Sequence, residues 1–187
     1  MFKKTKNVVS VVFSFIRFFL IKMVRWRELS YKGIERFSPK TMINIYPKGK
    51  LKLGVKVRAH TGTKISVTPN AVMTIGDNTT INYNCIFVAR KRIVIGKDVA
   101  FGPNVVMYDH DHDYRSCTVI NSDGFKTGEI VIGNNVWIGA NVIILRNTHI
   151  GDNCVVAAGT VVKGDYESNS LIYNEKVTKS RKYNRGE

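Results

Sequence analysis

An aliphatic residue recurs every six positions through the C-terminal half of the chain, and this period limits the possible folds more than any other feature. The uninterrupted run is Ile132, Ile138, Ile144, Ile150, Val156 and Val162. A six-residue period fits neither an amphipathic helix nor an alternating strand. It is typical of a β-solenoid, in which each hexad forms one flat side of a triangular coil. We therefore expect an all-β solenoid with an aliphatic core. Gly or Ala follows four of these aliphatic residues. This small residue is expected to let the chain turn the corner.

The same period occurs earlier in two runs that are offset by two residues. The first run is Ile75, Ile81, Phe87 and Ile93, and the second is Ile95, Phe101 and Met107. The offset predicts a two-residue insertion near Arg92. A longer interruption, 108–131, predicts a loop that leaves the solenoid. Residues 51–74 are rich in β-formers but off register, and we expect an irregular capping segment at 31–74. The solenoid then spans 75–173, and 174–187 form a basic C-terminal tail.

The N-terminal third is strongly basic. The net charge is +15, and residues 1–64 contain 16 Lys and Arg but only two acidic residues. Basic residues flank the apolar run 8–21, and Lys3, Asn7, Ser10, Ser14 and Arg17 recur at helical spacing. Residues 1–30 are therefore predicted to form a basic amphipathic helix with one narrow polar stripe. This arrangement favours an anionic membrane surface over nucleic acid as partner. The alternative is a helix that packs on its own subunits.

The three cysteines do not form a disulfide framework. Cys85 and Cys154 both take the fifth position of a hexad, where small or branched residues recur, and Cys117 lies in the long interruption. An odd number without close spacing indicates a reducing compartment and argues against a zinc–thiolate site. We therefore expect a cytoplasmic protein associated with the inner face of the membrane.

The interruption begins with Tyr108–Tyr114, in which two of the four histidines of the chain alternate with three aspartates. Histidine titrates near neutrality and can act as a general base. A neighbouring carboxylate can fix its tautomer. A loop leaving a rigid scaffold is a common place for such a group. The alternative is a polar surface turn.

Several segments resemble the hexapeptide-repeat acyltransferases, in particular the maltose and galactoside O-acetyltransferases and those of capsule and lipopolysaccharide assembly. The resemblance covers about 70–175. Besides the Asp-His-Asp-His loop, it is carried by Ile75-Gly76-Asp77-Asn78, Gly102-Pro103-Asn104-Val105-Val106, the segment 132–142, Ile150-Gly151-Asp152-Asn153 and the segment 157–162. It implies a left-handed parallel β-helix that assembles as a homotrimer, with active sites between subunits. It also implies acetyl-CoA as co-substrate and no metal.

The resemblance also implies roles for individual residues. The family's catalytic histidine follows the Asn of a Pro-Asn pair by eight residues, which from Asn104 gives His112, with His110 as second choice. Asn82 matches a sugar-contacting position, and Asp109 is placed with the substrate-binding residues. Arg90 stands where galactoside enzymes carry a sugar-binding Asp, which favours a different, even anionic, sugar. Positions lining the coenzyme A channel, or near its phosphates, are matched by Trp137, Ala140, Ala158, Lys163, Gly164 and Arg181.

The predicted function is acetyl-CoA-dependent O-acetylation of a sugar hydroxyl on a surface polysaccharide or its lipid-linked precursor. One alternative is an acetyltransferase for a soluble acceptor, namely a free sugar, an amino sugar, serine or a xenobiotic. Another is a γ-type carbonic anhydrase, which needs three zinc-binding histidines; His110, His112 and His149 do not have that family's spacing. A non-catalytic scaffold is the last alternative.

Overall fold

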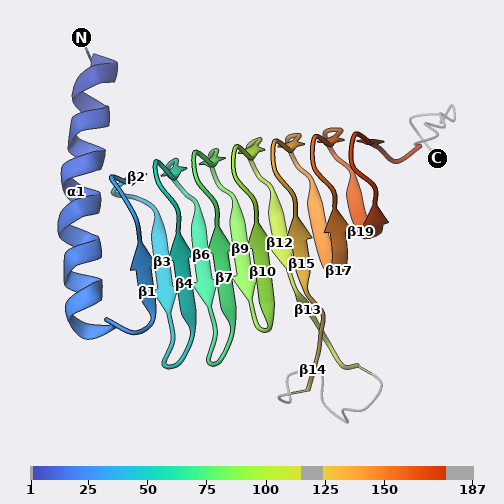
Figure 1. The fold of residues 1–187 in the computed structure, drawn as a ribbon, viewed down its shortest axis with the longest axis horizontal. Coiled ribbons are helices and arrows are strands. Elements are labelled where there is room, and N and C mark those ends of the chain that lie inside the picture. The colour runs from blue at the N-terminus through green and yellow to red at the C-terminus, as the bar shows by residue number, and fades with distance from the viewer. Residues whose placement is uncertain (1, 115–123, 176–187) are drawn as a thin grey trace, which may run out of the picture.

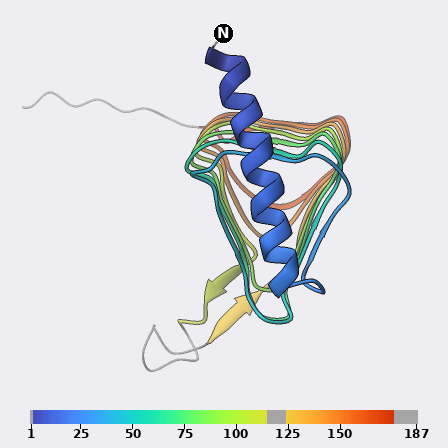
Figure 2. The ribbon, with the colours of Figure 1, turned by 90° about the vertical axis from the view of Figure 1, so that its left-hand side faces the viewer.

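The computed structural model describes residues 2–114 and 124–175, with side chains from Asn7 onward. One helix, α1 (Phe2–Val24), lies across one end of a left-handed parallel β-helix, and the coils stack away from it (Figure 1). Viewed along the stack, the coils form a triangle with three flat faces (Figure 2). The sequence-based prediction of a hexapeptide solenoid with an N-terminal helix is confirmed.

Each coil contributes one strand to each face. The first face contains β1 (Leu29–Tyr31), β4 (Lys50–Leu53), β7 (Val72–Ile75), β10 (Arg92–Ile95), β15 (Ile130–Ile132) and the C-terminal parts of β17 (Ile143–Ile150) and β19 (Val161–Tyr166). The second face contains β2 (Arg36–Phe37), β5 (Arg58–Ala59), β8 (Thr80–Ile81), β11 (Ala100–Phe101), β16 (Trp137–Ile138), β18 (Val155–Val156) and β20 (Leu171–Ile172). The third face contains β3 (Met42–Ile45), β6 (Lys64–Val67), β9 (Ile86–Ala89), β12 (Val106–Tyr108) and the N-terminal parts of β17 and β19.

The aliphatic residues of the hexads point inward, as their period predicts. Those of the main run and of both earlier runs are at most 2% exposed. Neighbouring strands pair in parallel and in register, so each side chain packs between its equivalents in the coils on either side. Cys85 and Cys154 are also buried, in the packing positions expected for them.

Residues 31–74 are not an irregular cap, which corrects the sequence-based expectation. Leu29, Leu51 and Met73 stand side by side on the first face at steps of 22 residues, and Ile93 follows 20 residues later. These coils are longer than three hexads. The hexad register is therefore lost in the sequence while the pairing of the strands is preserved.

Where a Gly or Ala follows the aliphatic residue, it serves close packing between coils rather than the turn itself. A Cβ on Gly76 would lie 2.4 Å from the carbonyl oxygen of Gly96, and one on Gly139 would lie 2.6 Å from the backbone N of Ala158. The turn is made two residues later by asparagines with positive φ, such as Asn78 at 56°. Asn tolerates this left-handed region better than most residues do.

Helix α1 caps the first coil through its polar stripe and one aromatic residue. The Oγ of Ser14 accepts a 2.8 Å hydrogen bond from the backbone N–H of Phe37, and Nη1 of Arg17 donates one of 2.6 Å to the carbonyl of Thr41. Phe18 is buried and packs edge-on against Phe37, with ring centroids 5.1 Å apart. Burial lowers the pKa of Arg17 below its usual value. The helix is thus part of the folded core.

Candidate active site

The two histidines of the predicted loop lie on a hairpin that leaves the solenoid at one corner. Its strands, β13 (His110–His112) and β14 (Phe125–Thr127), pair antiparallel, with His110 opposite Thr127 and His112 opposite Phe125. This third corner joins the third face of one coil to the first face of the next. The hairpin projects from it, away from the triangular cross-section (Figure 2).

Asp109 holds the base of this hairpin against the previous coil. Its carboxylate accepts hydrogen bonds of 2.7, 2.7 and 2.8 Å from the backbone N–H groups of Arg90, Lys91 and Arg92. These are the corner residues where the two-residue insertion was predicted. The carboxylate is 0% exposed, so we correct its assignment as a substrate-binding residue. Asp109 positions the backbone, and no face of it is open to an acceptor.

The imidazoles of His110 and His112 have different surroundings. Nδ1 of His110 lies 3.2 Å from Oδ1 of Asp109, and the side chain is 11% exposed, between the rings of Tyr108 and Phe125. His112 is exposed, and its ring centroid lies 4.6 Å from that of Phe125. The Asp109 contact can fix the tautomer of His110. His112 presents its ring to the solvent.

Two arginines from neighbouring corners reach the hairpin. The guanidinium carbon of Arg90 stacks 3.5 Å from the ring centroid of Phe125, which places this predicted substrate-binding residue beside the histidines. Nε of Arg146 bonds Oδ2 of Asp111 at 2.6 Å. The sequence reasoning missed Phe125 and Arg146. An aromatic residue at the far end of the interruption, and a basic residue at the equivalent corner one coil later, were the available signals.

The other predicted site residues do not join the histidines within one chain. Asn82, Ala140 and Ala158 lie on the second corner, between the second and third faces, where Oδ1 of Asn82 accepts the backbone N–H of Tyr83. Trp137 lies on the second face and is 59% exposed. Lys163 and Gly164 lie on the third corner, two coils beyond the hairpin. The third face thus lies between the second corner, with its predicted site residues, and the third corner, from which the hairpin projects. Arg181 is outside the described residues.

A charged row on the first face was also not anticipated. Arg92 bonds Glu129 at 2.9 Å, and Nδ1 of His149 lies 2.5 Å from Oδ1 of Asp165. Within the described ranges, no group of three or more His, Cys, Asp or Glu side chains is placed to hold a metal ion.

Comparison with known proteins agrees with this geometry. The family model for bacterial transferase hexapeptide (six repeats) matches residues 129–164. A protein of Escherichia coli K12, provisionally named as a lipopolysaccharide biosynthesis O-acetyl transferase, is 28% identical over 144 residues, covering 73% of this chain and 74% of that one. The galactoside O-acetyltransferase of the same organism is 37% identical over 100 residues, covering 51% and 46%. The chain thus spans about half the length of the second relative.

A solved structure gives the same result. The hexapeptide-repeat-containing acetyltransferase of Vibrio cholerae O1 biovar eltor, complexed with acetyl coenzyme A, superposes with a TM-score of 0.51 at 26% identity, covering 83% of this chain and 77% of that one. The fold and the matched segment 129–164 identify the coils as hexapeptide repeats of the bacterial transferase type. The proteins that this chain resembles in sequence and in structure are acetyltransferases, as the sequence predicted.

Proposed function

We propose that the protein is an acetyl-CoA-dependent O-acetyltransferase that modifies a sugar hydroxyl of a surface polysaccharide or its lipid-linked precursor. The observation that carries the proposal is the hairpin, which presents His112 at the edge of the solenoid. Asp109 and His110 hold the end of the hairpin that joins the solenoid. An exposed imidazole held on a rigid scaffold suits general-base chemistry on a large acceptor.

The third face supports a homotrimer as the active form. From the third coil onward its outward residues are largely apolar: Ile86, Val88, Val106, Tyr108, Ile143 and Val161. Ile143 and Val161 are 39% and 46% exposed in the single chain. Contiguous apolar surface of this kind marks an interaction site. A neighbouring subunit packed on this face would bring its own second corner close to the hairpin, which one chain cannot do.

The second corner and the exposed indole beside it suit the pantetheine arm of coenzyme A. Ala140 and Ala158 add little bulk there, and Trp137 supplies a flat apolar surface next to them. A Cβ added to Gly164 would meet nothing within 4 Å, so the backbone is open to close approach at this point of the third corner. The neighbouring Lys163 is exposed and can meet a phosphate.

The residues of the hairpin divide the chemistry between them. The imidazole of His112 accepts the proton of the sugar hydroxyl while the hydroxyl oxygen attacks the thioester carbon. The imidazolium then returns this proton to the sulfur as the C–S bond breaks. His110, held by Asp109, keeps the strand and the neighbouring ring in place. Arg90, beside Phe125, offers a positive charge to an anionic acceptor.

The test is acetyl transfer by the purified protein, followed as thiol release from acetyl-CoA. Repeat units of the surface polysaccharide from the source organism are compared with free sugars, amino sugars and serine. We expect transfer to the repeat unit at a rate well above that to any free acceptor. Equal or faster transfer to a soluble small acceptor would instead establish the soluble-acceptor alternative.

A further inference from the structure

Helix α1 binds the solenoid with its polar stripe and turns its apolar face outward. Ser14 and Arg17 face the first coil, whereas a helix covering a core normally buries its apolar side. The outward side chains are each at least 40% exposed: Val8, Val9, Val12, Phe13, Phe15, Ile16, Phe19, Leu20, Met23 and Val24. A contiguous apolar patch of this kind on a folded protein indicates a docking surface.

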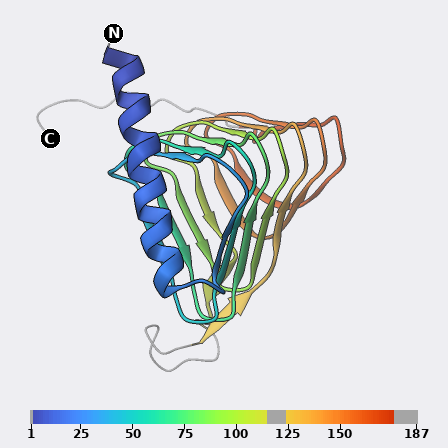
Figure 3. The same cartoon turned by 60° about the vertical axis from the view of Figure 1, so that its left-hand side comes forward.

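This apolar face forms the flat end of the molecule. The helix runs across the triangular end of the solenoid, roughly perpendicular to the direction in which the coils stack (Figures 1 and 3). Its outward residues therefore point along the stack, away from the coils. A planar partner can meet the whole length of the helix without touching the solenoid faces.

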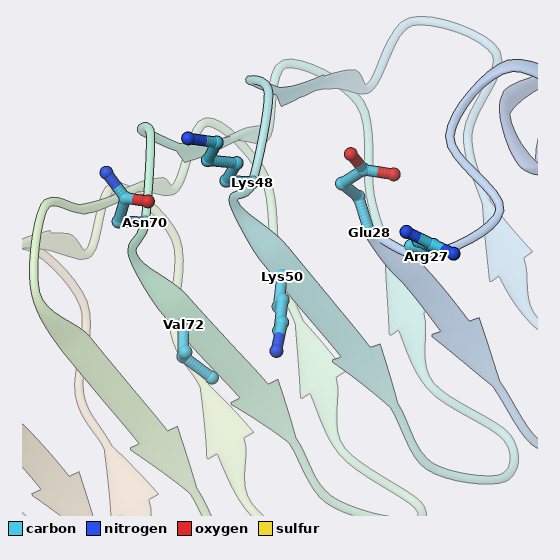
Figure 4. Close-up of a pocket in the computed structure, with 6 residues that line it drawn as sticks. All are labelled: Arg27, Glu28, Lys48, Lys50, Asn70 and Val72. Atoms are coloured by element: carbon cyan, nitrogen blue, oxygen red, sulfur yellow. The ribbon is translucent and has the colours of Figure 1, made fainter.

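Positive charge surrounds the same end. Beside the C-terminal end of α1 lies a depression of about 480 Å³ lined by Arg27, Lys48, Lys50, Glu28, Asn70 and Val72 (Figure 4). Its lining includes three basic side chains but only one carboxylate. Trp26 is 64% exposed next to it, and the Arg27 guanidinium stacks 4.7 Å from the Trp26 ring centroid. An apolar face edged by basic residues and Trp complements an anionic lipid surface.

We propose that α1 lies in the plane of an anionic bilayer, with its apolar face at the level of the upper acyl chains. The solenoid then stands along the membrane normal, and Arg27, Lys48 and Lys50 meet lipid phosphates. A second copy is a poorer occupant, because two ends of like charge would face each other.

Lying in the plane also preserves every contact of the helix with the solenoid. The stretch Asn7–Val24 is long and apolar enough to cross a membrane. To do so, Ser14 would have to leave Phe37, Arg17 would have to leave Thr41, and the Phe18 ring would have to leave the core. The in-plane position costs none of these contacts and exposes the apolar side to lipid.

The orientation has a consequence for the acceptor, and this step rests on the proposed function. The corner at Lys48 and the hairpin corner at Asp109 are three coils apart on the same edge of the solenoid. At about 4.8 Å per coil, the hairpin stands roughly 14 Å beyond the basic depression. If a glycan is joined to a membrane lipid through a phosphate, the sugar that reaches His112 would therefore lie some distance along the glycan from that phosphate.

Vesicle flotation of the full-length protein tests the docking without any acceptor. Vesicles of phosphatidylcholine with and without phosphatidylglycerol are compared for the wild type and for Phe15→Glu with Phe19→Glu, which change only exposed side chains. We expect the double variant to lose at least about tenfold in partitioning. Leu171→Glu, an equally exposed residue at the far end of the solenoid, is the matched control and should bind as the wild type does.

The basic depression has its own variant pair. Lys48→Glu with Lys50→Glu should abolish the preference for phosphatidylglycerol. Lys97→Glu, an exposed residue at the corner between the first and second faces, should leave that preference intact. Alkaline carbonate should release the bound protein. Undiminished binding of the Phe15/Phe19 variant would overturn the proposal. Resistance of the bound protein to carbonate would also overturn it, because this indicates a spanning helix. So would an assembly that forms without lipid and dissociates in the Phe15/Phe19 variant, because this indicates that a second copy covers the helix. A normal melting temperature of each variant shows that folding is preserved.

Discussion

Arg146 fixes Asp111, the residue between the two histidines, through a 2.6 Å bond from Nε to Oδ2. Arg146 belongs to the third corner of the coil after the hairpin. The hairpin is therefore held on two sides. On one side, Asp109 accepts hydrogen bonds from backbone N–H groups of the previous coil. On the other, the ion pair between Asp111 and Arg146 joins the hairpin to the next coil. The orientation of both imidazoles depends on these two attachments.

Removal of this ion pair should lower activity more than stability. We expect Arg146→Ala to reduce kcat about tenfold or more, because small displacements of catalytic groups are costly. The melting temperature should change little, since exposed ion pairs contribute little to stability. Arg92→Ala, which breaks the exposed pair with Glu129, is the matched control. If both variants lose the same activity, Arg146 has no specific positioning role.

The two histidines should differ in their effects on transfer. His112→Ala should reduce kcat by about 10²–10⁴-fold, as the loss of a general base does. His110→Ala should cost clearly less, and its loss should be partly restored in His110→Gln, which can still donate a hydrogen bond to Asp109. Steady-state kinetics with acetyl-CoA held at saturation makes the comparison. The reverse order of losses would make the Asp109-oriented imidazole of His110 the base.

Glu35 should make stability depend on pH. It is 3% exposed, Oε2 accepts a 2.6 Å hydrogen bond from the N–H of Val57, and Oε1 has no partner among the described residues. Burial, with Asp77 nearby, raises its pKa from 4.5 to about 7. Ionisation is thus disfavoured in the folded state. The loss in the free energy of unfolding that ionisation of Glu35 causes is absent below pH 4.5. It grows as the pH rises towards 7 and is complete above 7.

Glu35→Gln removes this dependence while keeping an acceptor for Val57. We expect the variant to be more stable than the wild type above pH 7, by up to about 3 kcal/mol, and the gain to shrink towards pH 4.5. Urea unfolding at a series of pH values measures it. A difference between the two proteins that is constant across this range would contradict a raised pKa.

The apolar third face should be required for assembly. We expect Ile143→Glu to convert a trimer to monomers in sedimentation equilibrium and to abolish transfer, because charge would be buried at the interface. Trp137→Glu, on the second face, should leave the oligomer intact and weaken coenzyme A binding. An active monomer would refute both the trimer and the shared site.

The sequence predicted the solenoid because its hexads repeat one local pattern. The residues of the run from Ile132 to Val162 occupy equivalent positions in their hexads. Each therefore pairs with another aliphatic residue of the run in the adjacent coil, as Ile132 does with Ile150. Residues 31–74 were misjudged for a related reason. Their coils are 22 residues long, and the step from Leu51 to Met73 becomes visible only when the strands are paired.

Local sequence also placed the histidines on a loop, but it could not assign their surroundings. The contacts of Asp109 with the N–H groups of residues 90–92 join segments that are 17 to 19 residues apart. The contacts of His110 and Arg90 with the Phe125 ring join residues on opposite sides of the loop within the interruption 108–131. Such pairs follow from how coils stack and where the hairpin closes.

The N-terminal helix shows the same division. The polar and apolar spacing of residues 3–21 by itself determined an amphipathic helix with one narrow polar stripe. It could not determine which side would face the protein, because a stripe of Ser and Arg is equally suited to water or to unpaired backbone groups. The tertiary structure decided this. The first coil leaves the N–H of Phe37 and the carbonyl of Thr41 without a preceding coil to bond them, and Ser14 and Arg17 satisfy both.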